Sequence, residues 1–275
     1  MILIGGGAIL FCLIYFFGRT IPLRKNTPPV VTAPESKGID INTILAASKQ
    51  KLSASRQSRI SQLEAAVVRG DVKEQQIKVY RQLAAFWKDS AQLLLPYAYY
   101  SAQAAELENS QKNLTFAAQF FLDGLRRQDD PELRRWMALQ AKELFEKALQ
   151  LAPGNDSLKV GLGSCYLFGN ISDSPMQGIQ LIREVADRNP GDLYAQFMLG
   201  LGDARTKQLD KAIERLSKVS QHEPDNLEAL FTLAEVYESK GDKANAIKCY
   251  ETGKKHIHEP GIVKEIDNRI SLLKK

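Results

Sequence analysis

The stretch that decides the fold is Leu227 to Pro260, which reads LEALFTLAEVYESKGDKANAIKCYETGKKHIHEP. It consists of two stretches with helical patterning and ends on a proline. Counting back along the chain, prolines recur at Pro224, Pro190 and Pro153, with spacings of 36, 34 and 37 residues. A period near 34 residues built from two helical stretches is typical of a helix-turn-helix solenoid.

Further positions repeat in the same register. A column of small residues is formed by Ala141, Gly178, Ala212 and Ala246. Four residues later, a column of large apolar residues is formed by Phe145, Ile182, Leu216 and Tyr250. A third column is formed by Leu162-Gly163, Leu199-Gly200 and Leu233-Ala234. Small residues let two helices approach closely and large ones fill the space beside them, so the columns predict stacked helical hairpins.

The columns resemble those of the tetratricopeptide-repeat (TPR) family, whose pattern is W-x2-L-G-x2-Y, then A-x3-F, then P. The last repeat matches at Leu233-Ala234, Tyr237, Ala246, Tyr250 and Pro260. The middle repeat departs from the pattern because Asp203 stands where the family has Tyr, and the earlier one has extra residues in its turn, 170–175. A fourth unit ends at Pro153 and has a degenerate first helix. The resemblance covers about half of the chain and predicts hairpins over 131–260.

Upstream of the repeats, residues 40–130 keep helical periodicity without clean columns. Ile60, Leu63 and Val67 fall on one helical face, and no run alternates with period two. We therefore expect divergent helical hairpins over 40–130 and a capping helix over 261–275. The fold class that follows is all-α, a TPR-type helical-hairpin solenoid with an N-terminal transmembrane helix.

The first residues predict a membrane anchor. Residues 1–18 contain no charged side chain and are mostly apolar, and the run extends to residue 21, about the length that a spanning helix needs. A cleaved signal peptide would show a basic start and a small-residue cleavage site, and neither is present. Residues 22–39 contain four prolines and are expected to form an extended linker. We expect a single-pass protein of the cell membrane with 1–21 as its anchor.

Charge indicates the topology. Arg19, Arg24 and Lys25 follow the apolar run, and the positive-inside rule then places the rest of the chain in the cytoplasm. Basic residues upstream of Met1, if the true start lies there, would reverse this and make the domain periplasmic, so both orientations stay open. These three residues also carry most of the formal charge of +5, which leaves no concentrated basic face and argues against nucleic-acid binding.

No catalytic or metal-binding constellation is visible. His256 and His258 are two residues apart and do not face each other on a helix. Asp130 before Pro131 is expected to be a helix cap rather than half of a carboxylate pair. The cysteines have no metal-type spacing and are expected to be free thiols. We expect no cofactor, no metal and no enzymatic activity.

The TPR resemblance implies that the first helix of each unit lines a concave groove. The side chains that it places there are Val160, Ser164, Leu167, Tyr194, Phe197, Leu201, Phe231, Glu235 and Glu238. The Lys, Arg and Asn residues with which chaperone-binding members of the family clamp a terminal carboxylate are absent. The predicted groove is apolar with an acidic end, which suits a protein or peptide with an apolar stripe. Filling of the groove by the chain's own helices is the open alternative.

These features predict a membrane-tethered, non-catalytic TPR scaffold that mediates protein–protein interaction. The alternative is an assembly or maturation factor on the outer face of the membrane, resembling the membrane-anchored TPR components of cytochrome c biogenesis or envelope assembly. The two hypotheses differ in the side of the membrane on which the domain lies.

Overall fold

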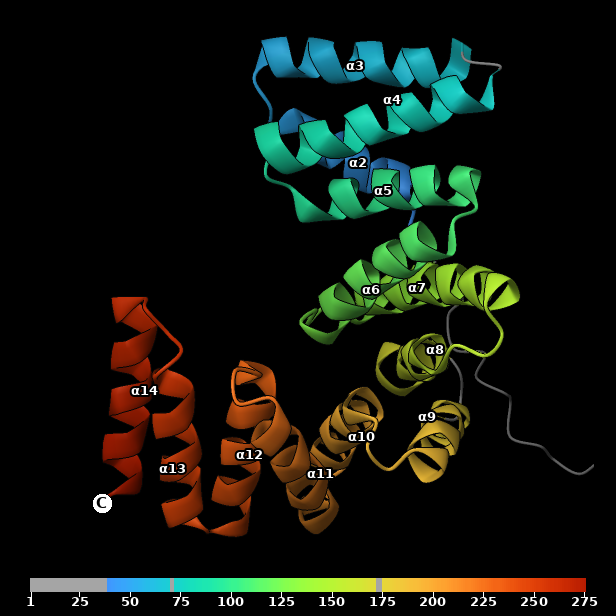
Figure 1. The fold of residues 1–275 in the computed structure, drawn as a ribbon. Helices are drawn as coiled ribbons and strands as arrows, with labels where there is room; N and C mark the ends of the chain where they lie inside the picture. The colour runs from blue at the N-terminus through green and yellow to red at the C-terminus, as the bar shows by residue number, and fades with distance from the viewer. Residues whose placement is uncertain (1–38, 70–71, 172–174) are drawn as a thin grey trace, which may run out of the picture. The chain divides into compact units, whose positions relative to one another are not determined.

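The computed structural model describes residues 39–69, 72–171 and 175–275, and these contain thirteen α-helices and one π-helix but no strand (Figure 1). The all-α prediction is confirmed for this part of the chain. Residues 38–275 form one compact unit. The predicted anchor, 1–21, and almost all of the linker lie outside the described residues. Within the described part, no helix combines the length and the apolar character needed to span a bilayer.

The helices follow one another along the chain and pack as sequential pairs. Their bounds are α2 (Ile41–Gln50), α3 (Ala54–Arg69), α4 (Lys73–Ala85), the π-helix η1 (Phe86–Ser90), α5 (Leu94–Glu108), α6 (Gln111–Arg126), α7 (Pro131–Leu151), α8 (Asp156–Gly169), α9 (Met176–Arg188), α10 (Leu193–Arg205), α11 (Leu209–His222), α12 (Leu227–Lys240), α13 (Lys243–Lys254) and α14 (Pro260–Leu273). The closest pairs are α4/α5, α6/α7, α8/α9, α10/α11 and α12/α13. Each repeat is thus a helical hairpin, and its second helix also packs against the first helix of the next hairpin, as α7 does on α8 and α11 on α12.

Short polar residues fix where the helices begin. Asp130 accepts hydrogen bonds from the backbone N–H groups of Glu132 and Leu133, and Pro131 occupies the first turn of α7. The capping interpretation of Asp130 is confirmed. Side-chain oxygens cap four later helices in the same way: Asn155 caps α8, Asp192 caps α10, Asn226 caps α12 and Asp242 caps α13.

The repeat columns are the contact surface inside each hairpin. Ala141, Ala212 and Ala246 are fully buried. At the remaining position of that column, Gly178 of α9 faces Gly163 of α8 so closely that a Cβ on Gly163 would lie 2.7 Å from the Gly178 carbonyl oxygen. No side chain fits between the two backbones there. The column of small residues therefore has the physical cause that the sequence predicted, which is close helix approach.

Three apolar clusters hold the described part together. The largest runs without a break from α5 to α12 and includes Phe121, Phe145 and Leu216. A second cluster lies within α2–α5 around the fully buried Trp87 of η1. The third joins α12 and α13 to α14 through Ile266 and Ile270, so α14 covers the last hairpin as a capping helix would.

The unit with the degenerate first helix is completed by α6. This helix packs against α7 as closely as any helix pair of the described residues. The predicted boundary at residue 130 falls in the turn between these two helices. The division into 40–130, 131–260 and 261–275 remains a prediction.

Candidate binding groove

The first helices of successive hairpins, α6, α8, α10 and α12, carry the side chains that the sequence assigned to a groove. Contacts link α6 to α8, α8 to α10 and α10 to α12, so these helices share one side of the hairpin stack. Each predicted residue can therefore be checked for whether its side chain is free to meet a partner. The outcome differs from helix to helix.

The α8 residues are not available to a partner. Val160 and Ser164 are fully buried, and the Ser164 hydroxyl donates to the Val160 carbonyl oxygen at 2.8 Å. Leu167 is 3% exposed and packs against α10, where a Cβ on Gly202 would lie 2.9 Å from its Cδ2. The expectation that these three side chains form an open surface is not met, because α6, α7, α9 and α10 all pack around α8.

On α10, two predicted residues are covered by α6. The Tyr194 hydroxyl donates to Gln119 Oε1 of α6 at 3.1 Å, and burial raises the pKa of this hydroxyl. The Phe197 ring lies under the guanidinium of Arg126, whose Cζ is 5.8 Å from the ring centroid. Here the chain's own helix occupies the predicted groove, which is the alternative that the sequence left open.

An open groove remains between α10 and α12. Its volume is about 480 Å³, within the range of roughly 300–1,000 Å³ that ligand sites usually span. Two predicted residues, Leu201 and Glu235, line it. Sequence reasoning missed the other lining residues, which are Ala204, Arg205, Lys207, Leu209, Thr232, Val236 and Ser239. Most of these are one helical turn from a predicted position, as Thr232 and Ser239 are from Glu235, so extending the predicted stripe by one turn would have found them.

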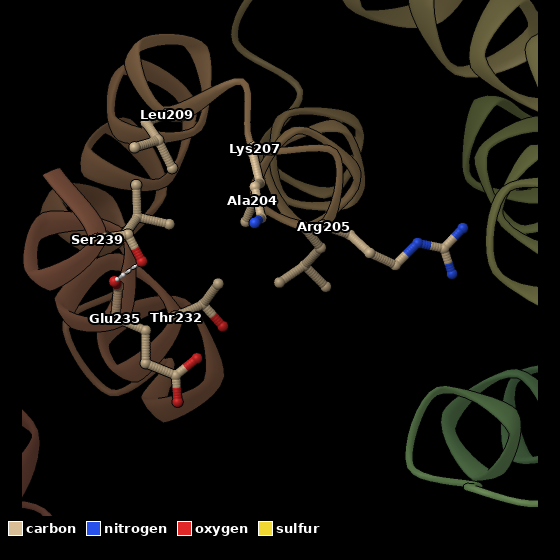
Figure 2. A pocket seen from close by; sticks show the side chains of 9 residues that line it. Ala204, Arg205, Lys207, Leu209, Thr232, Glu235 and Ser239 are labelled. Carbon is tan, nitrogen blue, oxygen red and sulfur yellow. Dashed lines mark hydrogen bonds between the residues drawn. The ribbon is translucent and has the colours of Figure 1, made fainter.

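Charges divide the walls of this groove. The Glu235 side chain is exposed on α12, and no described side chain forms an ion pair with it. Its pKa is raised, mainly because neighbouring atoms exclude part of the water around the carboxylate and also because of the nearby charge of Glu238. Figure 2 shows Arg205 extending away from Glu235. Arg205 donates to the Leu167 carbonyl oxygen and lies 5.2 Å from the Phe168 ring centroid, so it does not neutralise the groove carboxylate.

Glu238, the second carboxylate at the acidic end of the predicted groove, is already neutralised. Glu238 accepts hydrogen bonds from the Tyr250 hydroxyl at 2.7 Å and from Arg269 Nε at 2.9 Å. Partial desolvation acts to raise the pKa of Glu238, but these donors and the positive charge of Arg269 hold it below its usual value. Phe231 stacks on Tyr250 with 6.0 Å between ring centroids and contacts Gly253. Both predicted residues are therefore engaged within the last hairpin and α14.

Reactive groups do not gather anywhere in the described part. No set of three or more His, Cys, Asp and Glu side chains in residues 39–69, 72–171 and 175–275 is placed to hold a metal ion. Cys165 and Cys249 are free thiols. Burial raises the pKa of both, to about 11 for Cys249, so neither is an activated nucleophile.

Sequence comparison gives the family of the last hairpins. Residues 204–260, which include α11, α12 and α13, match the model of the tetratricopeptide repeat. The TPR resemblance read from the columns is confirmed on this segment, and TPR proteins are in general non-catalytic scaffolds that bind proteins or peptides. No curated protein sequence matches this chain.

Several solved structures are similar to this chain. YrrB, described as a TPR protein with an unusual peptide-binding site, is 17% identical over 75% of this chain and 97% of its own, with a TM-score of 0.41. TTC0263, a thermophilic TPR protein of Thermus thermophilus, is 18% identical over 74% of this chain and 98% of its own, with a TM-score of 0.49. MamA of Desulfovibrio magneticus is 20% identical over 68% of this chain and 96% of its own, with a TM-score of 0.43. These identities and TM-scores are too low for the ligands or partners of those proteins to be assigned to this chain.

Proposed function

We propose that this chain is a non-catalytic TPR scaffold that binds a polypeptide in the groove between α10 and α12. The observation that carries the proposal is the groove itself, which has apolar walls from Leu201, Leu209 and Val236 and a carboxylate, Glu235, without an ion-pair partner in the described chain. An extended or helical segment with an apolar stripe could bury that stripe against the walls. A basic side chain of the same segment would pair with Glu235.

Site-specific photo-crosslinking tests the groove. A benzophenone side chain placed at Thr232, which lines the groove, is expected to cross-link to a bound polypeptide in cells that make the full chain. Thr252 on α13 is the matched control, because it lies outside the groove and its hydroxyl only donates to the Lys248 carbonyl oxygen of its own helix. Equal cross-linking from both positions, or none from Thr232, would refute the proposal.

A charge added to the apolar wall gives a second readout. Leu201→Glu places a second carboxylate in the groove beside Glu235, and we expect the cross-link from Thr232 to fall at least about tenfold, the change that roughly 1.4 kcal/mol produces. Helicity measured by circular dichroism should not change, since Leu201 is only partly buried. Phe197 and Phe231 are poorer test positions, because both are packed within the chain and their truncation would alter stability as well as binding.

We further propose that residues 1–21 tether the scaffold to a membrane, with the domain on the cytoplasmic side. The support is the uncharged apolar run followed by Arg19, Arg24 and Lys25. A topology reporter fused after residue 40 tests both parts. Activity on the outer face would favour an assembly or maturation factor there, and recovery of the full chain in the soluble fraction would exclude the tether.

A further inference from the structure

Arg126, near the end of α6, crosses to two other hairpins. Its Nη1 donates to Glu228 Oε1 on α12 at 2.8 Å, and its Nη2 donates to Asp123 Oδ1 on its own helix, also at 2.8 Å. The guanidinium lies over the Phe197 ring of α10, with 5.8 Å between Cζ and the ring centroid. Only 9% of the side chain is exposed. One aromatic face and two carboxylates thus surround a desolvated cation, and these three groups are called here the guanidinium site.

The chemistry of this site is that of cation recognition rather than of packing alone. An aromatic face attracts a cation most strongly when water is excluded, and planar guanidinium donors match carboxylate oxygens. Arg126 itself is not completely hydrogen-bonded in this site, because its Nε is buried and has no hydrogen-bond partner. A guanidinium that arrives from another direction can bring all its donors to partners or to water, so exchange with Arg126 is physically reasonable.

The guanidinium site adjoins the open groove. Phe197 and Leu201 are four residues apart on α10, and Glu228 and Thr232 are four residues apart on α12, so each pair lies on one helical face. Leu201 and Thr232 line the groove. A polypeptide lying between α10 and α12 that extends by one helical turn toward their N-terminal ends therefore meets Phe197 and Glu228.

We propose that Phe197, Asp123 and Glu228 bind an arginine side chain of the polypeptide held in the groove, and that Arg126 occupies their site in the free protein. This inference rests on the proposed function for the identity of the ligand. Binding of the arginine displaces Arg126 and releases its bridge between α6 and α12. Arg126 thus competes with the arginine of the polypeptide for the same site. A segment without a basic side chain cannot displace it.

Chemical rescue tests the site without any peptide. Arg126→Ala in the full chain removes the atoms that ethylguanidinium contains, so the cation can fill the space left behind. In isothermal titration calorimetry we expect ethylguanidinium to bind Arg126→Ala at least about tenfold more tightly than the wild type, whose site is filled. Adding Glu228→Gln should weaken this binding by about fivefold or more, because a charge-assisted bond is lost. Neutral ethylurea, which has a similar shape, should not bind.

Arg205→Ala is the matched control. Arg205 also lies over an aromatic ring, that of Phe168, but its guanidinium donates to a backbone carbonyl oxygen and has no carboxylate partner among the described residues. We expect no specific ethylguanidinium binding there. The proposal would be overturned if ethylguanidinium bound the wild type, Arg205→Ala or the double variant Arg126→Ala/Glu228→Gln as tightly as it binds Arg126→Ala.

The experiment remains decisive if Arg126→Ala lowers helicity. Arg126→Ser keeps a small polar side chain and leaves the space of the guanidinium open, so the same titration, with methylguanidinium as the cation, then applies to it. Its failure to bind the cation would equally contradict the inference. Failure of the Thr232 cross-link with successful rescue would instead remove the polypeptide and leave the guanidinium site, so the two proposals fail separately.

Discussion

The N-terminal hairpins and the repeats pack helices together by different means. In α8 and α9 the backbones touch at Gly163 and Gly178, where no Cβ fits. Among α4, η1 and α5, aromatic rings fill the space: Trp87 of η1 is fully buried, and the ring centroids of Tyr80 and Tyr100 are 6.3 Å apart. Small residues must recur at fixed positions to let backbones meet, whereas rings of different size fill gaps without a period. This difference explains why only the second region shows columns in the sequence.

The largest effect is expected from removing the central ring of the aromatic region. Trp87→Ala should lower the free energy of unfolding by about 3–5 kcal/mol, because the ring is fully buried and leaves a cavity. Hydrogen exchange should then speed up mainly in α2–α5, since the second apolar cluster is confined to these helices and η1. Trp87→Phe is the matched control: the Nε1 of Trp87 has no hydrogen-bond partner, so the loss should stay below about 1.5 kcal/mol. Equal losses for both variants would contradict this account.

The converse change overfills the repeat contact. A Cβ at position 178 would meet the carbonyl oxygen of Gly163 and lie 2.8 Å from the Tyr166 Cβ, so Gly178→Ala should cost about 1–3 kcal/mol. Hydrogen exchange should become faster in α8 and α9 but not in α2–α5. At Gly154 no atom lies within 4 Å of the added Cβ, and Gly154→Ala in urea unfolding should therefore differ little from the wild type. A stable Gly178→Ala would mean that the backbones do not touch.

Asp203 is where the repeats depart from their own pattern, and its effect should depend on pH. Burial raises the pKa of Asp203 above the ordinary value of 3.8, although Arg215, with Nε 3.0 Å from Oδ2, partly offsets this. The native state therefore holds this proton more tightly than the unfolded state, so its contribution favours folding at low pH and is lost as pH rises through the native pKa. Relative to Asp203→Asn, the wild type should lose stability upward from about pH 3.8 in urea unfolding. A flat difference would show that Arg215 compensates the burial.

The smallest effect is expected at the end of the stack, where an exposed ion pair adds to a small apolar cluster. Arg269 of α14 donates to Glu238 of α12 through Nε at 2.9 Å, and about half of its side chain is exposed. Arg269→Ala should cost about 1 kcal/mol or less, as exposed ion pairs usually do. The change should appear as faster hydrogen exchange in α14 alone. Faster hydrogen exchange throughout the repeats would mean that α14 stabilises more than the last hairpin.

The sequence alone determined the repeat architecture. The columns of Ala141, Ala212 and Ala246 are buried as predicted, because helical spacing fixes which residue of one helix meets the next helix of the same hairpin. The upstream helices could be predicted as divergent hairpins, but the sequence did not show which side chains join them. Their aromatic contacts have no fixed spacing.

Only the tertiary structure decided which part of the predicted groove is open. The columns place Phe197 and Leu201 on the same face, yet Arg126 covers the first and leaves the second free. That distinction depends on a contact between Arg126 and Glu228, residues of hairpins that are not adjacent along the stack. A period of about 34 residues specifies how each hairpin meets its neighbour. The period does not specify contacts between hairpins that are not adjacent. The distance between such hairpins depends on the geometry of every interface that separates them.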